Sequence, residues 1–151
     1  MITSIKGKEF IKSFEGLKLK FYRDSGGVGT IGFGHTRTVE HGQVITEKQA
    51  NDLFDSDIGI AEARMKGKVT NWQLLKQHEF DCLVSLAFNL RSFNKLMTHL
   101  NFSREKFLNK IELYVHDIAG NKLPGLVKRR AREKHLFVFG KYIKLGENLT
   151  Q

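Results

Sequence analysis

The sequence predicts an α+β fold in which a small lobe with a three-stranded antiparallel sheet and a larger all-helical lobe enclose a cleft. Residues 17–33 alternate apolar and polar side chains around a glycine-rich turn, which is typical of strands. From residue 46 onward, apolar residues recur instead at helical spacing. A length of 151 residues suits a single domain, here one pinched into two lobes.

A short helix is expected over residues 4–14, where positions 10, 11 and 14 form an apolar face. Thr3 can cap its N-terminus, and Gly16 is placed to end it. Glu15 then lies at the helix C-terminus, where the helix dipole disfavours negative charge and so favours the protonated form that a general acid needs. The alternative is a solvated glutamate at a frayed helix end.

The next segment is expected to be a hairpin that turns at Ser25-Gly26-Gly27 and returns over residues 28–33. The alternation places Asp24 on the polar face, and the return strand brings Thr30 near it, with Glu15 at the rim. Taken alone, Asp24 could simply start a turn and Thr30 could be an ordinary strand residue. A site that a ligand approaches closely is favoured by the glycines at positions 29, 32 and 34.

Two carboxylates held apart across a cleft are what glycosidic-bond hydrolysis requires, since one protonates the leaving oxygen and the other serves the opposite face of the sugar. The stretch from Phe14 to Thr36 resembles the active-site signature of the phage-type lysozymes, or endolysins. Its spacing Glu-x8-Asp-x5-Thr matches the catalytic triad of that family at Glu15, Asp24 and Thr30.

The resemblance covers nearly the whole chain in order. Residues 79–89 are similar to the central-helix motif of the family, and residues 123–133 resemble its C-terminal Pro-Gly-Leu and Arg-Arg helix. The chain departs from the family at Leu90-Arg91, Lys76-Gln77 and residues 94–97. These departures concern the far wall of the cleft and leave the three catalytic positions intact.

The resemblance implies a lysozyme-like fold and a muramidase that hydrolyses the β-1,4 bond between N-acetylmuramic acid and N-acetylglucosamine in peptidoglycan, with inversion, causing host cell lysis. It implies Glu15 as the general acid, Asp24 as the general base or electrostatic stabiliser, and Thr30 as a holder of the attacking water. Thr36 and Phe88 are expected, from motif position only, to contact substrate. No metal or cofactor is implied, and we expect a monomer.

The helices expected after the hairpin can be placed from capping signals and apolar periodicity. A capping box at Thr46 to Gln49 opens a helix that runs to about Lys66. The later helices are expected at residues 77–90, 93–100, 104–118 and, after Pro124-Gly125, through about 138. We therefore expect a sheet-bearing lobe at about 14–45, a connecting helix at about 46–66, and a helical lobe at about 67–151 that includes the N-terminal helix.

The net charge is +9, from 25 basic and 16 acidic residues. Between residues 122 and 144 only Glu133 is acidic, against Lys122, Lys128, Arg129, Arg130, Arg132, Lys134, Lys141 and Lys144. A basic surface favours encounters with polyanions such as wall polymers or nucleic acid, although it can equally be a solvated helix face.

Other features indicate a soluble globular protein, and the family resemblance implies that it accumulates in the host cytoplasm. No apolar run could span a membrane, and the N-terminus has no signal-peptide pattern. The resemblance then implies access to the periplasmic cell wall through a holin-type pore. Cys82 is expected to be a buried small residue, and His35 a structural hydrogen-bonding partner.

Two rival functions remain open. A lytic transglycosylase acts on the same substrate but needs one acid and no water-positioning carboxylate, so Asp24 and Thr30 argue against it. A non-catalytic basic module that binds wall polymer or nucleic acid would explain the charge but not the Glu-Asp-Thr arrangement. We expect no specific nucleic-acid partner.

Overall fold

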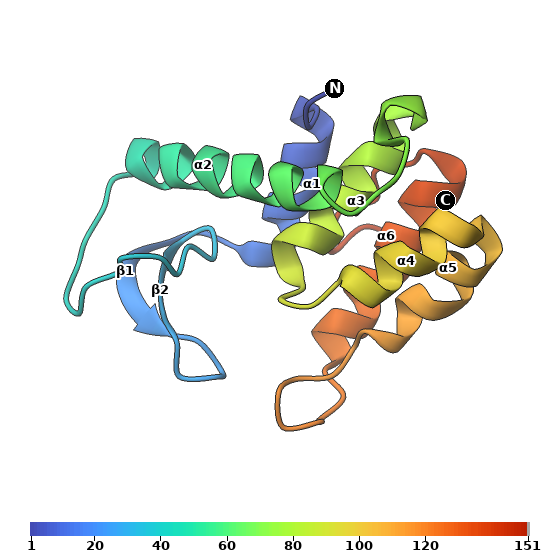
Figure 1. Cartoon of the computed structure of the whole chain (residues 1–151). Helices are drawn as coiled ribbons and strands as arrows, with labels where there is room; N and C mark the ends of the chain where they lie inside the picture. Colours follow the sequence, from blue (N-terminus) through green and yellow to red (C-terminus); the bar gives the residue numbers. More distant parts are fainter. Residues whose placement is uncertain (151) are drawn as a thin grey trace.

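The computed structural model describes residues 1–150. Along these residues the elements are α1 (Ile5–Glu15), β1 (Lys18–Arg23), β2 (Gly29–Gly32), α2 (Glu47–Lys66), the 3₁₀ turn η1 (Trp72–Leu74), α3 (Gln77–Asn89), α4 (Asn94–Phe102), α5 (Arg104–Lys110), the 3₁₀ turn η2 (Ile111–Leu113) and α6 (Pro124–Phe139). The hairpin lies on one side and helices α3 to α6 on the other, with the long helix α2 reaching from one to the other (Figure 1).

Helix α1 begins one residue later than expected. Ser4, and not Thr3, is the N-cap, since its hydroxyl accepts a hydrogen bond from the Gly7 amide at 3.0 Å. Thr3 instead donates its amide and its hydroxyl to Glu62 of α2, at 2.7 and 2.6 Å. The expected end is confirmed, because Gly16 follows with a φ of 66°, a conformation that suits glycine.

The sheet has two strands, so the expectation of three was wrong. β1 and β2 pair antiparallel around the expected turn. The segment that could add a third strand makes one isolated bridge, between Lys20 and Val44. Val44 is 65% exposed, so longer pairing there would bury little apolar surface. The amide of the next residue, Ile45, still donates to the Leu19 carbonyl of β1 at 2.9 Å, while its side chain packs with Ile31 and Ala50 in a small separate core. The pairing goes no further because Thr46 is already the N-cap of α2.

Helix α2 begins and ends as expected. The Thr46 hydroxyl accepts from the Gln49 amide at 3.1 Å, and the Gln49 side chain accepts from the Thr46 amide at 2.8 Å, which completes a capping box. Gly67 follows its last residue. This helix therefore joins the hairpin side of the molecule to the helical side through regular backbone.

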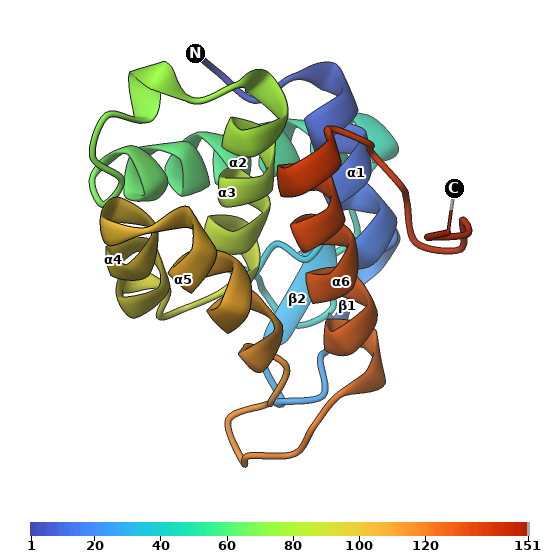
Figure 2. The same ribbon diagram turned by 90° about the vertical axis from the view of Figure 1, so that its right-hand side faces the viewer.

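Helix α3 is buried at the centre of the helical side, as its nearly uniform apolar character predicted. It contacts α1, α2 and α6, and Figure 2 shows α6 crossing the molecule between α3 and α1. The apolar side chains of α3 with no exposed surface are Phe80, Cys82, Leu83, Val84, Leu86 and Ala87. Burial raises the pKa of the Cys82 thiol well above its usual range, so this cysteine is an unreactive core residue.

The expected helix over residues 104–118 stops earlier. It ends at Lys110, tightens into η2, and continues as a loop that returns at an isolated bridge between His116 and Lys122. The loop closes where Asp117 accepts a hydrogen bond from the Asn121 amide at 2.8 Å. An aspartate that bonds backbone ahead of it favours a turn over a helix, which explains the early end. Among residues 1–150, no helix is long and apolar enough to cross a membrane.

Candidate active site

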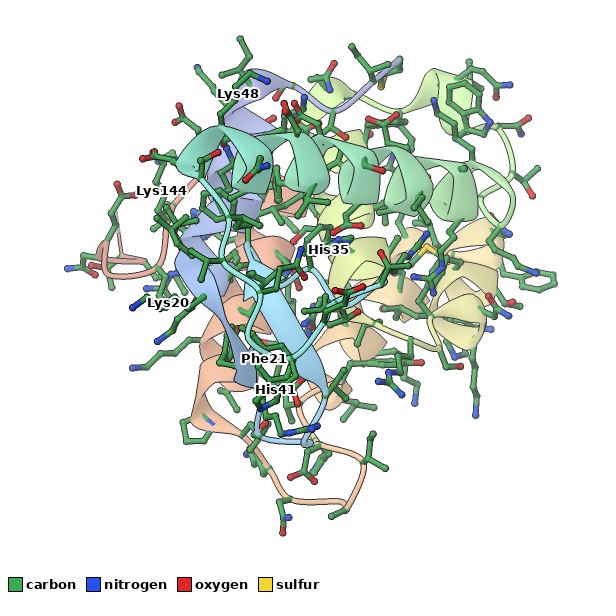
Figure 3. All side chains as sticks on the ribbon, turned by 90° about the vertical axis from the view of Figure 1, so that its left-hand side faces the viewer. Lys20, Phe21, His35, His41, Lys48 and Lys144 are labelled. Atoms are coloured by element: carbon green, nitrogen blue, oxygen red, sulfur yellow. The ribbon has the colours of Figure 1, made fainter. Side chains whose placement is uncertain are left out.

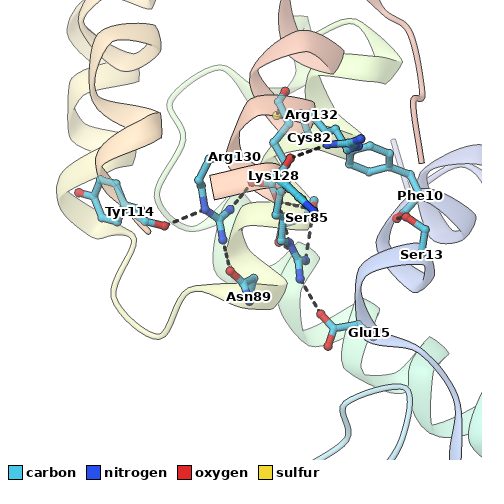
Figure 4. Close-up of polar contacts among 12 residues, drawn as sticks. Phe10, Ser13, Glu15, Cys82, Ser85, Asn89, Tyr114, Lys128, Arg130 and Arg132 are labelled. Carbon is cyan, nitrogen blue, oxygen red and sulfur yellow. Dashed lines mark hydrogen bonds and ion pairs between the residues drawn. The ribbon is translucent and has the colours of Figure 1, made fainter. Parts of the chain in front are cut away.

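Glu15 is the last residue of α1 and is fixed from a distant part of the chain. Arg129 of α6 donates a hydrogen bond from Nη1 to Oε1 of Glu15 at 2.6 Å (Figure 4). The side chains of Glu15 and Arg129 are 18% and 4% exposed. The guanidinium also lies over the ring of Phe14, 4.8 Å from its centroid. The carboxyl of Glu15 therefore has one defined position, with a charged partner behind it.

The second oxygen of Glu15 faces the loop that follows β2. A Cβ atom built on Gly34 would lie 2.6 Å from Oε2 of Glu15, and Gly34 has a φ of 72°. Both facts require glycine at this position, because any side chain would collide with the carboxyl or strain the backbone. Within residues 1–150, no group of the protein donates a hydrogen bond to Oε2, so this oxygen is available to a ligand.

Asp24 and Thr30 lie at the turn end of the hairpin and share a partner in Val28. One oxygen of Asp24, Oδ1, accepts hydrogen bonds from the amides of Gly26 and Val28, both at 2.9 Å. Thr30 is buried and donates its hydroxyl to the Val28 carbonyl at 2.8 Å. Asp24 is thus a turn residue, as the simpler interpretation held, but it keeps a second carboxylate oxygen exposed to solvent.

Tyr22 stands opposite Thr30 in the register of the two strands. Its pKa is raised, first by burial and then by the negative charges of Glu15 and Asp24. Glu15 at the end of α1 and Asp24 at the hairpin turn are therefore both close enough to the Tyr22 phenol for their charges to act on it. Sequence reasoning gave Tyr22 no role, although it forms part of the quoted Tyr-x-Asp motif.

His35 anchors the loop after β2 to helix α2. Its Nδ1 lies 2.7 Å from Oδ2 of Asp57, and both side chains are largely buried. Figure 3 shows His35 below α2, beside the hairpin. The expectation of a structural hydrogen-bonding histidine is confirmed, and the contact holds Gly34 in place next to Glu15.

A cavity of about 270 Å³ continues from Gly34 between the loop after β2, α2 and the end of α3. Thr36 and Phe88, the two residues expected to contact substrate, both line it. Glu15, Asp24 and Thr30 are not part of this lining. Of the three, Glu15 lies next to the cavity, because it closely approaches the lining residue Gly34.

Comparison with known proteins identifies the family of this chain. The sequence model described as "Phage lysozyme" matches residues 12–133, which span α1 to α6 and include every residue of the site. This chain belongs to the phage lysozyme family. The "Endolysin" of Acyrthosiphon pisum secondary endosymbiont phage 1 is 34% identical over 146 residues, which cover 91% of this chain and 98% of that protein. The "Endolysin" of Salmonella phage P22 is 31% identical, covering 91% and 99%.

Solved structures agree with the family assignment. The endolysin from Escherichia coli O157:H7 phage FAHEc1 superposes with a TM-score of 0.81 at 29% identity, covering 95% of this chain and 98% of that one. The muramidase domain of SpmX from Asticaccaulis excentricus gives a TM-score of 0.79 at 30% identity, covering 90% of this chain and 97% of that one. The expected lysozyme-like α+β fold is confirmed, and this phage lysozyme is a glycoside hydrolase.

In this phage lysozyme, part of the expected basic surface is buried. Arg129 and Arg130 are 3% and 0% exposed and form ion pairs with Glu133, itself 0% exposed. The interpretation of these two arginines as surface charge was wrong. Helical spacing on α6 turns them towards α3, where Arg129 also donates to the Ser85 carbonyl at 3.3 Å.

The described part of this phage lysozyme contains no group of three or more His, Cys, Asp or Glu side chains that could hold a metal ion.

The residues that sequence reasoning missed are Arg129, as the partner of Glu15, and Tyr22. The partner could not be found from sequence spacing, because 114 positions separate Arg129 from Glu15.

We expect Gly34→Ala to lower the turnover of this phage lysozyme by roughly 10²-fold, because the new methyl would displace the Glu15 carboxyl by about an ångström. Gly59→Ala on α2 is the matched control, since a Cβ there meets nothing within 4 Å. Lysis rates and thermal melting of both variants measure the effect. Full activity of a folded Gly34→Ala protein would show that the close approach has no part in positioning Glu15.

Proposed function

We propose that this phage lysozyme is an endolysin muramidase that hydrolyses the β-1,4 bond between N-acetylmuramic acid and N-acetylglucosamine in bacterial peptidoglycan. Glu15 acts as the general acid, Asp24 as the general base or electrostatic stabiliser, and Thr30 as a holder of the attacking water. The sheet-bearing lobe and the helical lobe act together as one domain around the substrate. Thr36 and Phe88 contact the bound sugars.

The placement of Glu15 carries this proposal. Arg129 holds Oε1 of Glu15, so Oε2 faces the backbone at Gly34, where the lack of a side chain lets a ligand approach closely. A glycosidic oxygen bound beside Gly34 would meet Oε2 of Glu15. Proton transfer from a positioned carboxyl to the leaving oxygen is the first requirement of glycoside hydrolysis.

The hairpin supports the second requirement, an oriented water. The Thr30 hydroxyl donates its hydrogen to the Val28 carbonyl, so towards a water it can act only as an acceptor. The free oxygen of Asp24 is also an acceptor. A water that donates one hydrogen to each of them keeps a lone pair for attack on the anomeric carbon, and Asp24 takes the proton that is released.

This arrangement predicts inversion at the anomeric carbon. Inverting glycosidases leave room for a water between the sugar and the second carboxylate, whereas retaining ones bring that carboxylate into direct attack. We expect an α-configured product from the β-linked substrate and no covalent adduct on Asp24. NMR of the first-formed product, before mutarotation, measures the configuration. A β-anomer would remove the water-holding role of Asp24 and Thr30 while leaving Glu15 as the acid.

The rival functions give different products. A lytic transglycosylase would release glycan ends with an internal anhydro ring, each lighter by one water than a hydrolysis product. A binding module would shift DNA or bind wall material without releasing reducing ends. A turbidity assay on permeabilised Gram-negative cells, with mass analysis of the fragments and a DNA-shift assay alongside, separates the three.

The biological setting follows from the proposed activity. Peptidoglycan is the substrate, and the enzyme would accumulate in the host cytoplasm as a monomer and reach the wall through a holin-type pore. Its relatives named as endolysins and the likeness to a muramidase domain support this proposal.

A further inference from the structure

The cavity beside Gly34 is lined by three arginines, Arg37, Arg64 and Arg91. Arg64 has a structural explanation. It donates hydrogen bonds to the carbonyls of Ala87, Leu90 and Arg91, at 2.6, 3.1 and 2.8 Å. These carbonyls lie at the C-terminal end of α3, where backbone acceptors have no helical partner. Arg64 therefore closes that helix end and fixes the backbone that presents Arg91.

Arg37 and Arg91 have no comparable explanation. Both are exposed, and neither side chain makes a hydrogen bond or ion pair within residues 1–150. The acidic residue in the lining is Asp57, whose Oδ2 contacts His35. Three guanidinium groups against one carboxylate leave the cavity with an excess of positive charge, and two of the three retain all their donors.

The two free arginines come from separate parts of the fold. Arg37 lies in the loop after β2, and Arg91 follows α3. The residue after Arg37, Thr38, has a φ of 49°, a left-handed conformation that is costly for a β-branched side chain. Such strain persists only where the surrounding structure imposes it, and it is concentrated at ligand-binding segments.

We propose that Arg37 and Arg91 form a carboxylate-binding subsite that recognises acidic groups of the glycan substrate, an inference that rests on the proposed muramidase function. The guanidinium fork matches a carboxylate with paired hydrogen bonds. Phe88 supplies an apolar wall in the same cavity. Two parts of peptidoglycan carry carboxylates: the lactyl group of muramic acid, where no peptide is attached, and the stem peptide, where one is.

The test compares three purified glycan strands: one with stem peptides, one stripped of peptide so that the lactyl carboxylates are free, and the stripped strand with its carboxyls converted to neutral methyl amides. The enzyme variant is Arg37→Gln/Arg91→Gln. The control variant is Lys6→Gln/Lys106→Gln, which removes the same charge from exposed lysines outside the described cavities. Release of reducing ends gives kcat and KM for each pair.

We expect the arginine variant to lose about tenfold or more in kcat/KM on a carboxylate-bearing strand, mainly through KM, and to match wild type on the methyl-amide strand. Loss on the peptide-bearing strand alone assigns the stem peptide, and loss on the stripped strand alone assigns the lactyl group. The lysine control should change little on any strand, and the unfolding midpoints of both variants should stay near that of wild type.

Equal fractional loss on charged and neutral strands, or no loss on any strand, would overturn the subsite. A loss of the same size in the lysine control would replace it with general electrostatic attraction. Wild-type turnover of the methyl-amide strand reports on the proposed function separately from the subsite. If wild type cleaves none of the strands, the proposed function fails and the subsite fails with it.

Discussion

Glu15→Gln should lower the rate of lysis by ~10²–10⁴-fold, which is the usual contribution of a positioned general acid. An amide has nearly the same size as a carboxyl, and its oxygen can still accept the hydrogen bond from Arg129. It cannot deliver a proton to the leaving sugar oxygen. The loss should therefore appear in kcat, with the fold and substrate binding largely preserved.

The matched control for this variant is Glu9→Gln. Glu9 lies on the same helix and forms an ion pair of its own, with Lys144 at 3.0 Å, but it is 56% exposed and is not part of the cavity lining. We expect Glu9→Gln to lyse cells as fast as wild type. Turbidity clearance and circular dichroism of both proteins give the comparison. Near-native lysis by folded Glu15→Gln would remove Glu15 from the mechanism.

The features that could be predicted from the sequence are those decided by neighbouring residues or by a motif. The end of α1 at Gly16 and the capping box of Thr46 with Gln49 were predicted correctly, because both are decided by residues within a few positions. The family resemblance also singled out Thr36 and Phe88, and both residues line the same cavity. These features need only local chemistry or a motif.

The errors arose where tertiary packing decides the outcome. The expected third strand is reduced to one bridge with β1, because Val44 is exposed there and Thr46 already caps helix α2. The sequence alone counts Arg129 and Arg130 in the basic surface and leaves open a role in holding the helix in place, since neither burial nor a partner is visible in a basic run. Composition alone cannot show that Glu133 neutralises such a run from within the core.

Those buried charges form a network in which each partner depends on the others. Oε1 of Glu133 accepts from Nε of Arg129 at 3.1 Å and from the Ser85 hydroxyl at 2.6 Å, and Oε2 pairs with Arg130. Arg130 also donates to Asn89 and, at 3.0 Å, to the carbonyl of Tyr114 (Figure 4). Burial lowers the pKa of Arg130, and the charge of Glu133 opposes that effect.

Glu133→Gln should therefore destabilise the protein by about 3–5 kcal/mol, because it leaves two buried guanidinium groups with the negative charge of Glu15 alone. Urea unfolding followed by circular dichroism measures the change. Glu112→Gln is the matched control, since Glu112 is 52% exposed in its ion pair with Lys134, and such pairs contribute no more than ~1 kcal/mol.

A double variant distinguishes charge imbalance from simple loss of packing. Arg130→Met removes the cation that Glu133→Gln leaves unpaired, so Glu133→Gln/Arg130→Met should be more stable than the sum of the two single losses predicts. Strict additivity, or a loss below ~1 kcal/mol in Glu133→Gln, would show that the pair is not coupled. If coupling is observed, the stability of the core depends on the charge of Glu133, which also pairs with Arg129, the arginine that holds the proposed acid Glu15.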